Sequence, residues 1–197
     1  LRPAASPPPH RTMAKAGDWI PSPLSDETKL VHAGVSPDKE TGAILTPIHQ
    51  STTFVQESID KYMGKGYSYS RTTNPTVKVL EAKISSLEGA AGTTCFATGM
   101  AATVTVMSAF LEQGDHCVLT NCSYGGTNRV ARMQFMRYGI DFSFVDFRDL
   151  AAVKAAITPK TKLIFSETPA NPTLTLTDLA ALSAIAKAAG VLHVCDA

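Results

Sequence analysis

From Asn74 onward, short apolar runs alternate with longer segments of helical pattern, and this alternation constrains the fold more than any other feature. Five runs have the length and the content of Val, Ile, Leu and Phe that are typical of buried strands. They cover residues 93–97, 116–120, 141–145, 162–167 and 191–195. Strands that alternate with helices pair in parallel and are covered by helices on both faces. The sequence therefore predicts a doubly wound, mainly parallel α/β sheet.

The segments around these runs have the apolar spacing of helices. In the first, residues 74–89, Asn74 suits the N-cap, Pro75 suits the first turn and Gly89 suits the end. Its apolar side chains recur at helical spacing and form one stripe, which consists of Val77, Leu80, Ile84 and Leu87. Further helices are expected over residues 100–114, 126–139, 148–157 and 176–190.

The N-terminal part of the chain shows little periodicity. Residues 18–70 are rich in Gly, Pro, Ser and Thr, and we expect an N-terminal arm that lies on a partner rather than on its own core. Residues 1–17 begin with Leu1 and contain no acid, so we expect a disordered leader or the remnant of a transit peptide. The expected location is cytoplasmic, or a plastid or mitochondrion if residues 1–12 are such a remnant.

Composition argues against several kinds of partner. The formal net charge of +1 gives no reason to expect nucleic acid. No apolar run approaches the roughly 20 residues that span a bilayer, so no membrane partner is expected. The histidines are scattered and form no i, i+4 pair, so no metal site is expected. Cys95, Cys117 and Cys195 lie in apolar runs, which favours reduced core cysteines over disulfides.

Polar residues follow the predicted strands at the edge where an open α/β sheet binds its ligands. Gly99 and Met100 follow the first strand and open a helix, so their backbone N–H groups could bind a phosphate or simply form a tight turn. Tyr124 follows the second strand and precedes two glycines. Its ring could stack on a flat ligand or belong to the core.

The later strand ends carry an amide and a carboxylate. Asn171 lies between Pro169 and Pro172, which would present its side chain stiffly, although a structural loop explains the pattern equally well. Asp196 follows the last predicted strand and could cap the next element or face a protonated heterocycle.

A further pair of residues precedes the first predicted helix. Arg71, two residues after Tyr69, could bind a phosphate or be a solvated surface side chain. Taken together, the residues at the strand ends and this pair suit a phosphorylated, flat heterocycle whose ring nitrogen stays protonated.

Five separated motifs resemble those of one enzyme family. These are "YSRTTNPT", "ATGMAAT", "YGGTNR", "ETPANPT" and the terminal "CDA". In order and spacing they resemble the Cys/Met metabolism pyridoxal-phosphate enzymes, which include cystathionine γ-synthase, cystathionine γ-lyase, methionine γ-lyase and the O-acylhomoserine sulfhydrylases. The resemblance runs from about Leu30 to Ala197. It implies the fold-type I, aminotransferase-like architecture, with residues 71–197 as an incomplete cofactor domain.

The resemblance also implies which residues bind pyridoxal 5′-phosphate. Gly99 and Met100 would offer N–H groups to its phosphate. Tyr69 and Arg71 would reach that phosphate from a neighbouring subunit of a homo-oligomer, a tetramer built of dimers. Tyr124 would stack on the pyridine ring and act in proton transfer.

The same resemblance assigns the other polar residues to the ring and the substrate. Asn171 would hydrogen-bond the phenolic oxygen, Arg129 would line the substrate side, and Asp196 would pair with the pyridinium nitrogen. A carboxylate beside the ring nitrogen favours its protonated form. The protonated ring then accepts electrons from the α-carbon of the substrate.

In the family a lysine that forms a Schiff base with the cofactor follows the aspartate in a Ser-x-Thr-Lys setting. This sequence ends one residue after Asp196, and Lys160 and Lys162 precede a strand at the opposite edge of the sheet. We therefore expect a fragment of a longer coding sequence, inactive alone. Its edge strand at 191–195 would make it prone to aggregate when expressed alone.

The expected function is that of a transsulfuration enzyme, a cystathionine γ-lyase or γ-synthase that eliminates or replaces the γ-substituent of a sulfur amino acid. Methionine γ-lyase and O-acylhomoserine sulfhydrylase are alternatives within the family. A non-catalytic short product that associates with full-length subunits is an alternative of another class. An NAD-dependent oxidoreductase is disfavoured because the glycine fingerprint G-x-G-x-x-G does not occur.

Overall fold

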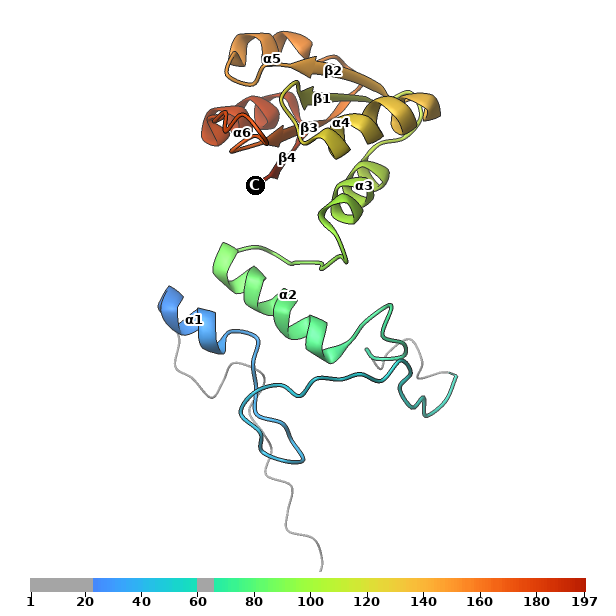
Figure 1. Cartoon of the computed structure of the whole chain (residues 1–197), viewed down its shortest axis with the longest axis vertical. Helices are drawn as coiled ribbons and strands as arrows, with labels where there is room; N and C mark the ends of the chain where they lie inside the picture. Colours follow the sequence, from blue (N-terminus) through green and yellow to red (C-terminus); the bar gives the residue numbers. More distant parts are fainter. Residues whose placement is uncertain (1–22, 60–65) are drawn as a thin grey trace, which may run out of the picture. The chain divides into compact units, whose positions relative to one another are not determined.

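The computed structural model describes residues 23–59 and 66–197. The predicted leader, residues 1–17, lies outside these described residues. The chain divides into two compact units, Leu1–Cys95 and Phe96–Ala197, whose α-helices and strands are labelled in Figure 1.

In its described residues, the first unit contains two helices, α1 (Asp26–His32) and α2 (Pro75–Glu88). Helix α2 begins and ends where the sequence predicts. The side chain of Asn74 accepts a hydrogen bond from the Thr76 N–H at 2.9 Å, and Gly89 ends the helix with a φ of 61°. Both features are helix-terminus signals that local sequence encodes, because they satisfy backbone groups that the helix itself leaves unpaired.

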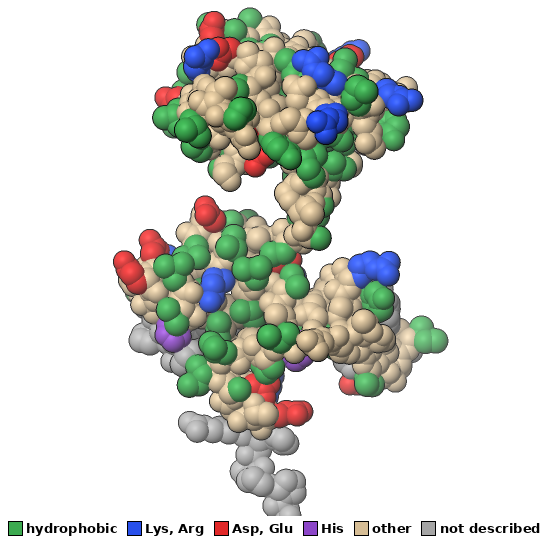
Figure 2. Space-filling model, viewed as in Figure 1, with side chains coloured by type: hydrophobic (Ala, Val, Ile, Leu, Met, Phe, Trp, Pro, Cys, Tyr) green, Lys and Arg blue, Asp and Glu red, His purple; other side chains and the backbone are tan. Residues whose placement is uncertain are grey.

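The apolar side chains of the first unit are largely exposed (Figure 2). Helix α2 contains no buried residue, and its predicted stripe leaves Val77, Leu80 and Ile84 between 39% and 50% exposed. The arm before it leaves four large apolar side chains between 63% and 78% exposed: Ile44, Leu45, Ile48 and Val55. This unit therefore has apolar surface that the described residues of the unit do not cover.

The second unit is built on a four-stranded parallel sheet in the order β2-β1-β3-β4, which confirms the predicted α/β class (Figure 1). The strands are β1 (His116–Thr120), β2 (Asp141–Val145), β3 (Thr161–Glu167) and β4 (Leu192–Asp196). The first two match the predicted bounds, because each is rich in apolar residues and is followed by polar or turn-forming residues.

Three strand predictions need correction, and the smallest change is that β3 begins at Thr161, one residue earlier than predicted. Residues 93–97 form no strand, since none of the described strands pairs with them and an apolar run becomes a strand only when a neighbouring ladder takes up its backbone groups. Strand β4 begins and ends one residue later than predicted, so Asp196 lies within the strand and pairs in register with Glu167.

Helices cover both faces of the sheet. They are α3 (Gly99–Phe110), α4 (Gly125–Val130), the π-helix η1 (Ala131–Phe135), the 3₁₀-helix η2 (Met136–Tyr138), α5 (Leu150–Ala156) and α6 (Leu179–Ala189). The single helix predicted over 126–139 is thus a continuous run of three helical types. None of the described helices is long and apolar enough to cross a membrane.

Alternate strand residues point into two separate cores. Leu119 of β1 packs with Met107 of α3 and with Phe135 on one face. On the other face, Val118 packs with Val153 of α5, in a cluster that also includes residues of α6. Because all four strands pair in parallel, their carboxyl ends lie at one edge of the sheet.

All four cysteines are free. Cys117 is fully buried, as predicted for a core cysteine, and burial raises the pKa of its thiol well above the usual range. Cys95 and Cys195 are only half-buried, so the predicted core position applies fully to Cys117 alone among the three.

Candidate functional site

The start of helix α3 presents two backbone donors. Thr98 caps the helix, since its side chain accepts from the Ala101 N–H at 3.0 Å and its carbonyl accepts from the Ala102 N–H at 3.2 Å. Within the described residues, no acceptor pairs with the N–H groups of Gly99 and Met100. A Cβ at Gly99 would meet no atom within 4 Å, so an anion has room to reach these donors.

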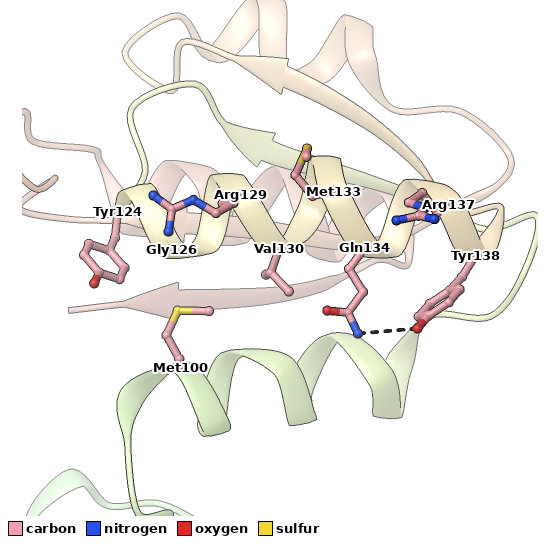
Figure 3. Close-up of a pocket in the computed structure, with 9 residues that line it drawn as sticks. All are labelled: Met100, Tyr124, Gly126, Arg129, Val130, Met133, Gln134, Arg137 and Tyr138. Carbon is pink, nitrogen blue, oxygen red and sulfur yellow. Dashed lines mark hydrogen bonds between the residues drawn. The ribbon is translucent and has the colours of Figure 1, made fainter.

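Tyr124 lies directly before α4, and its side chain is 46% exposed rather than buried in the core. The two glycines that follow it differ in environment. A Cβ at Gly126 would lie 2.6 Å from Cε1 of Tyr124 and 2.7 Å from Sδ of Met100, whereas a Cβ at Gly125 would meet nothing within 4 Å. Gly126 is therefore the point where the Tyr124 ring and the start of α3 approach the backbone (Figure 3).

Glu167 was not among the predicted site residues, yet it hydrogen-bonds the backbones of two of them. It is the last residue of β3 and is only 5% exposed. Its Oε2 accepts a hydrogen bond from the backbone N–H of Tyr124 at 2.6 Å, and its Oε1 accepts one from the backbone N–H of Asn171 at 2.7 Å. The sequence did contain one signal for this role, a carboxylate at the end of an apolar run. A buried acid in that place needs hydrogen-bond donors nearby.

The Asn171 side chain is available for a ligand. Glu167 fixes the backbone of Asn171 by accepting its N–H. Asn171 itself is exposed, and its side chain forms no hydrogen bond within the described part of the chain. The loop around it is closed by the Ala170 N–H, which donates to the Thr175 carbonyl at 3.0 Å, and by the Leu174 N–H, which donates to the Ala170 carbonyl at 2.7 Å. An amide on a fixed backbone can hydrogen-bond a ligand oxygen with little ordering cost.

Asp196 stands beside Glu167 on the neighbouring strand. Burial raises the pKa of the Asp196 carboxyl, and the negative charge of Glu167 raises it further. No Lys or Arg of the described ranges forms a salt bridge with either carboxylate. A positive charge placed against Asp196 would relieve this repulsion and stabilise the ionised carboxylate.

Arg129 lies on α4 and lines a hollow of about 730 Å³ between α3 and the α4–η1 run (Figure 3). Met100 and Tyr124 line the same hollow, but Asn171 and Asp196 do not. The exposed Arg129 guanidinium therefore belongs to the Tyr124 side of the site. At the far end of the hollow, Gln134 and Tyr138 are joined by a hydrogen bond of 3.5 Å.

Tyr69 and Arg71 form a cluster of their own in the first unit. Tyr69 is held by an antiparallel bridge to Thr53, and the Arg71 guanidinium carbon lies 5.3 Å from the centroid of the Tyr69 ring. This is cation–π geometry, and it holds the guanidinium over the face of the tyrosine ring.

The chemistry of the second unit fits one kind of ligand. Free backbone donors suit a phosphate, and a half-exposed ring suits a flat face. A fixed amide suits a ring oxygen, and a partly buried carboxylate without a cation suits a protonated ring nitrogen. In the described ranges, no group of three or more His, Cys, Asp and Glu side chains could hold a metal ion.

Comparison with known proteins points the same way. The family model "Cys/Met metabolism PLP-dependent enzyme" matches residues 27–197. A cystathionine gamma-lyase of Bacillus subtilis is 44% identical over 173 residues, which are 88% of this chain and 45% of that protein. A cystathionine gamma-synthase of Mycobacterium bovis is 44% identical over 156 residues, which are 79% of this chain and 40% of that protein.

A solved structure agrees with the fold. The crystal structure of cystathionine gamma-lyase from Lactobacillus plantarum complexed with L-serine superimposes with a TM-score of 0.82 at 45% identity, over 88% of this chain and 45% of that one. This chain thus spans less than half the length of these relatives. Since the family model covers most of the sequence, the chain belongs to the Cys/Met metabolism PLP-dependent enzymes, and its cofactor is pyridoxal 5′-phosphate.

Proposed function

We propose that the polypeptide to which this chain belongs is a transsulfuration enzyme that eliminates or replaces the γ-substituent of a sulfur amino acid. The names of its relatives, a cystathionine gamma-lyase and a cystathionine gamma-synthase, support this reaction class. In this proposal the chain is a fragment, inactive alone, that supplies the phosphate, ring-stacking and ring-nitrogen parts of the cofactor site.

The observation that carries the proposal is the partly buried Asp196 carboxylate, whose pKa is raised beside Glu167 with no described cation to balance it. Bound pyridoxal phosphate supplies an electron sink for the α-carbon of the amino acid, and it does so best when its ring nitrogen is protonated. The role of Asp196 is to hold a proton at that nitrogen through a charge-assisted hydrogen bond.

The other residues bind and orient. Gly99 and Met100 donate their free N–H groups to the phosphate, and Asn171 donates its side-chain amide to the phenolic oxygen. Tyr124 covers one face of the ring, and its hydroxyl moves protons between solvent and substrate. Arg129 binds on the substrate side of that ring, because it shares a hollow with Tyr124.

We further propose that Tyr69 and Arg71 complete the phosphate site of a neighbouring subunit. The exposed apolar side chains of the arm, such as Ile44 and Ile48, support an interface between copies of the chain. The proposed assembly is a homo-oligomer of dimer pairs.

The test is an activity and binding experiment on the product of the native gene. Incubation with L-cystathionine should release cysteine, 2-oxobutanoate and ammonia, or incubation with an O-acylhomoserine and cysteine should form cystathionine. Asp196→Asn should lower cofactor affinity, whereas Asp141→Asn, at the exposed start of β2, should not. Failure of the native product to bind pyridoxal phosphate would refute the proposal.

A further inference from the structure

Glu167 connects two loops that both carry proposed cofactor-binding residues. Its two carboxylate oxygens accept one backbone N–H each, from Tyr124 at 2.6 Å and from Asn171 at 2.7 Å. The Tyr124 donor follows β1 and the Asn171 donor follows β3, so one buried side chain fixes the separation of the stacking ring and the amide.

The same loops also touch at Cys122 and Thr173, where Sγ and Oγ1 lie 2.8 Å apart at an exposed position. A contact of neutral groups in solvent contributes little, because water competes for both partners. Hydrogen bonds to a buried carboxylate are stronger, since the acceptor is charged and water is excluded. Glu167 is therefore the contact that sets the geometry between these loops.

The charge of Glu167 matters as well as its shape. It faces two N–H donors and no described Lys or Arg, and Asp196 lies opposite it in the strand register. Two carboxylates at neighbouring strand ends favour a cation and disfavour a neutral ring in the same place.

We propose that Glu167 is a positioning residue whose negative charge holds Tyr124 and Asn171 in one frame and, together with Asp196, selects a ligand with a positively charged ring. The inference rests on the cofactor site proposed above. It assigns Glu167 no contact with the reacting atoms, since its two oxygens are occupied by backbone donors.

Substitution by glutamine separates charge from shape. Gln has the length of Glu but offers one acceptor oxygen and one NH₂ group, so one backbone N–H would face another donor. Glu167→Asp retains the charge but shortens the reach by one methylene group. The matched control is Glu112→Gln, which alters an exposed acid in the loop before β1.

The experiment measures dissociation constants of two probes for the full-length apoprotein by fluorescence titration. One probe is 4-deoxypyridoxine 5′-phosphate, which binds without a covalent bond to the protein. The other is the analogue in which carbon replaces the ring nitrogen, so that the ring cannot carry a positive charge. The ratio of the two constants reports selection for the charged ring.

The wild-type protein and Glu112→Gln should both prefer the pyridine probe. Glu167→Gln should bind that probe about tenfold more weakly and lose most of the preference. Glu167→Asp should bind both probes more weakly but retain the preference, which is the decisive result if Glu167→Gln does not fold.

Three results would be adverse, and they differ in meaning. If the wild type binds neither probe, the proposed function itself fails. If the wild type binds but Glu167→Gln has an unchanged preference, or Glu167→Asp loses it, the role of the charge is overturned. If both variants bind as tightly as the wild type, Glu167 does not position the site.

Discussion

Replacement of Gly126 by alanine should weaken cofactor binding by displacing the Tyr124 ring. The new Cβ would lie 2.6 Å from Cε1 of that ring and 2.7 Å from Sδ of Met100. Since non-bonded carbon atoms pack at about 3.5–4.0 Å, the ring or the thioether must move by roughly 1 Å. The ring is 46% exposed, so it has room to turn toward solvent.

The expected cost falls on binding more than on folding. Alanine favours a helix over glycine by about 0.5–1 kcal/mol, and overpacking costs about 1–3 kcal/mol, so the net loss of stability should be about 1 kcal/mol. Loss of an aromatic stack is worth about 0.5–1.5 kcal/mol. The dissociation constant of the cofactor should therefore rise about two- to twelvefold.

The assay is titration of each apoprotein with 4-deoxypyridoxine 5′-phosphate, with a melting temperature measured in parallel. Gly125→Ala is the matched control, because a Cβ there meets no atom within 4 Å, and it should bind like the wild type. Equal losses in the two variants, or unchanged binding in Gly126→Ala, would refute the reasoning.

Three further predictions concern stability. Asp196→Asn should stabilise the ligand-free protein by about 0.5–1 kcal/mol at neutral pH, because it removes repulsion from Glu167. Because the pKa of Asp196 is raised in the folded state, this gain should vanish below about pH 4, where the carboxyl is protonated in both the folded and the unfolded state. Urea unfolding measured across pH tests this, and a gain that stays constant with pH would contradict it. Burial lowers the pKa values of His116 and His193 in the folded state, so the unfolded state takes up protons first as the pH falls. The stability that these histidines contribute is therefore complete above about pH 6.5 and should fall below it. A melting temperature that does not change between about pH 7 and 5 would contradict this. Thr127→Val should raise the free energy of unfolding by about 1 kcal/mol, because the fully buried Oγ1 of Thr127 has no hydrogen-bond partner within the described residues. Denaturant titration measures this, and a loss of stability would contradict the prediction.

The sequence predicts the architecture well where local pattern and tertiary structure agree. Strand β1 and helix α2 have the predicted termini because apolar runs, an N-cap such as Asn74 and a terminal residue such as Gly89 act locally. Residues 93–97 have an equally apolar pattern but no strand beside them, and pairing cannot be read from one segment.

The candidate site shows the same division. Tyr124, Asn171 and Asp196 could be singled out because parallel strands end at one edge of the sheet, so polar residues at the strand ends gather there. Gly99 was predicted from a strand over residues 93–97 that does not form, and its N–H group is unpaired because Gly99 opens helix α3. Glu167 is marked only by its place at the end of an apolar run, and its role could not be predicted, because one of its partners is the backbone N–H of Tyr124 in a loop distant in the sequence and a backbone donor leaves no signature in side-chain identity.

Asp196 is proposed to hold a protonated heterocycle at the carboxyl ends of β3 and β4. The most direct measurement is the ¹⁵N chemical shift of ring-labelled 4-deoxypyridoxine 5′-phosphate bound to the full-length protein, followed from neutral to alkaline pH. We expect the ring nitrogen of the bound probe to stay protonated well above the pH at which the free probe loses its proton, and we expect Asp196→Asn to lose that effect. A bound probe that titrates like the free one in the wild type would contradict it.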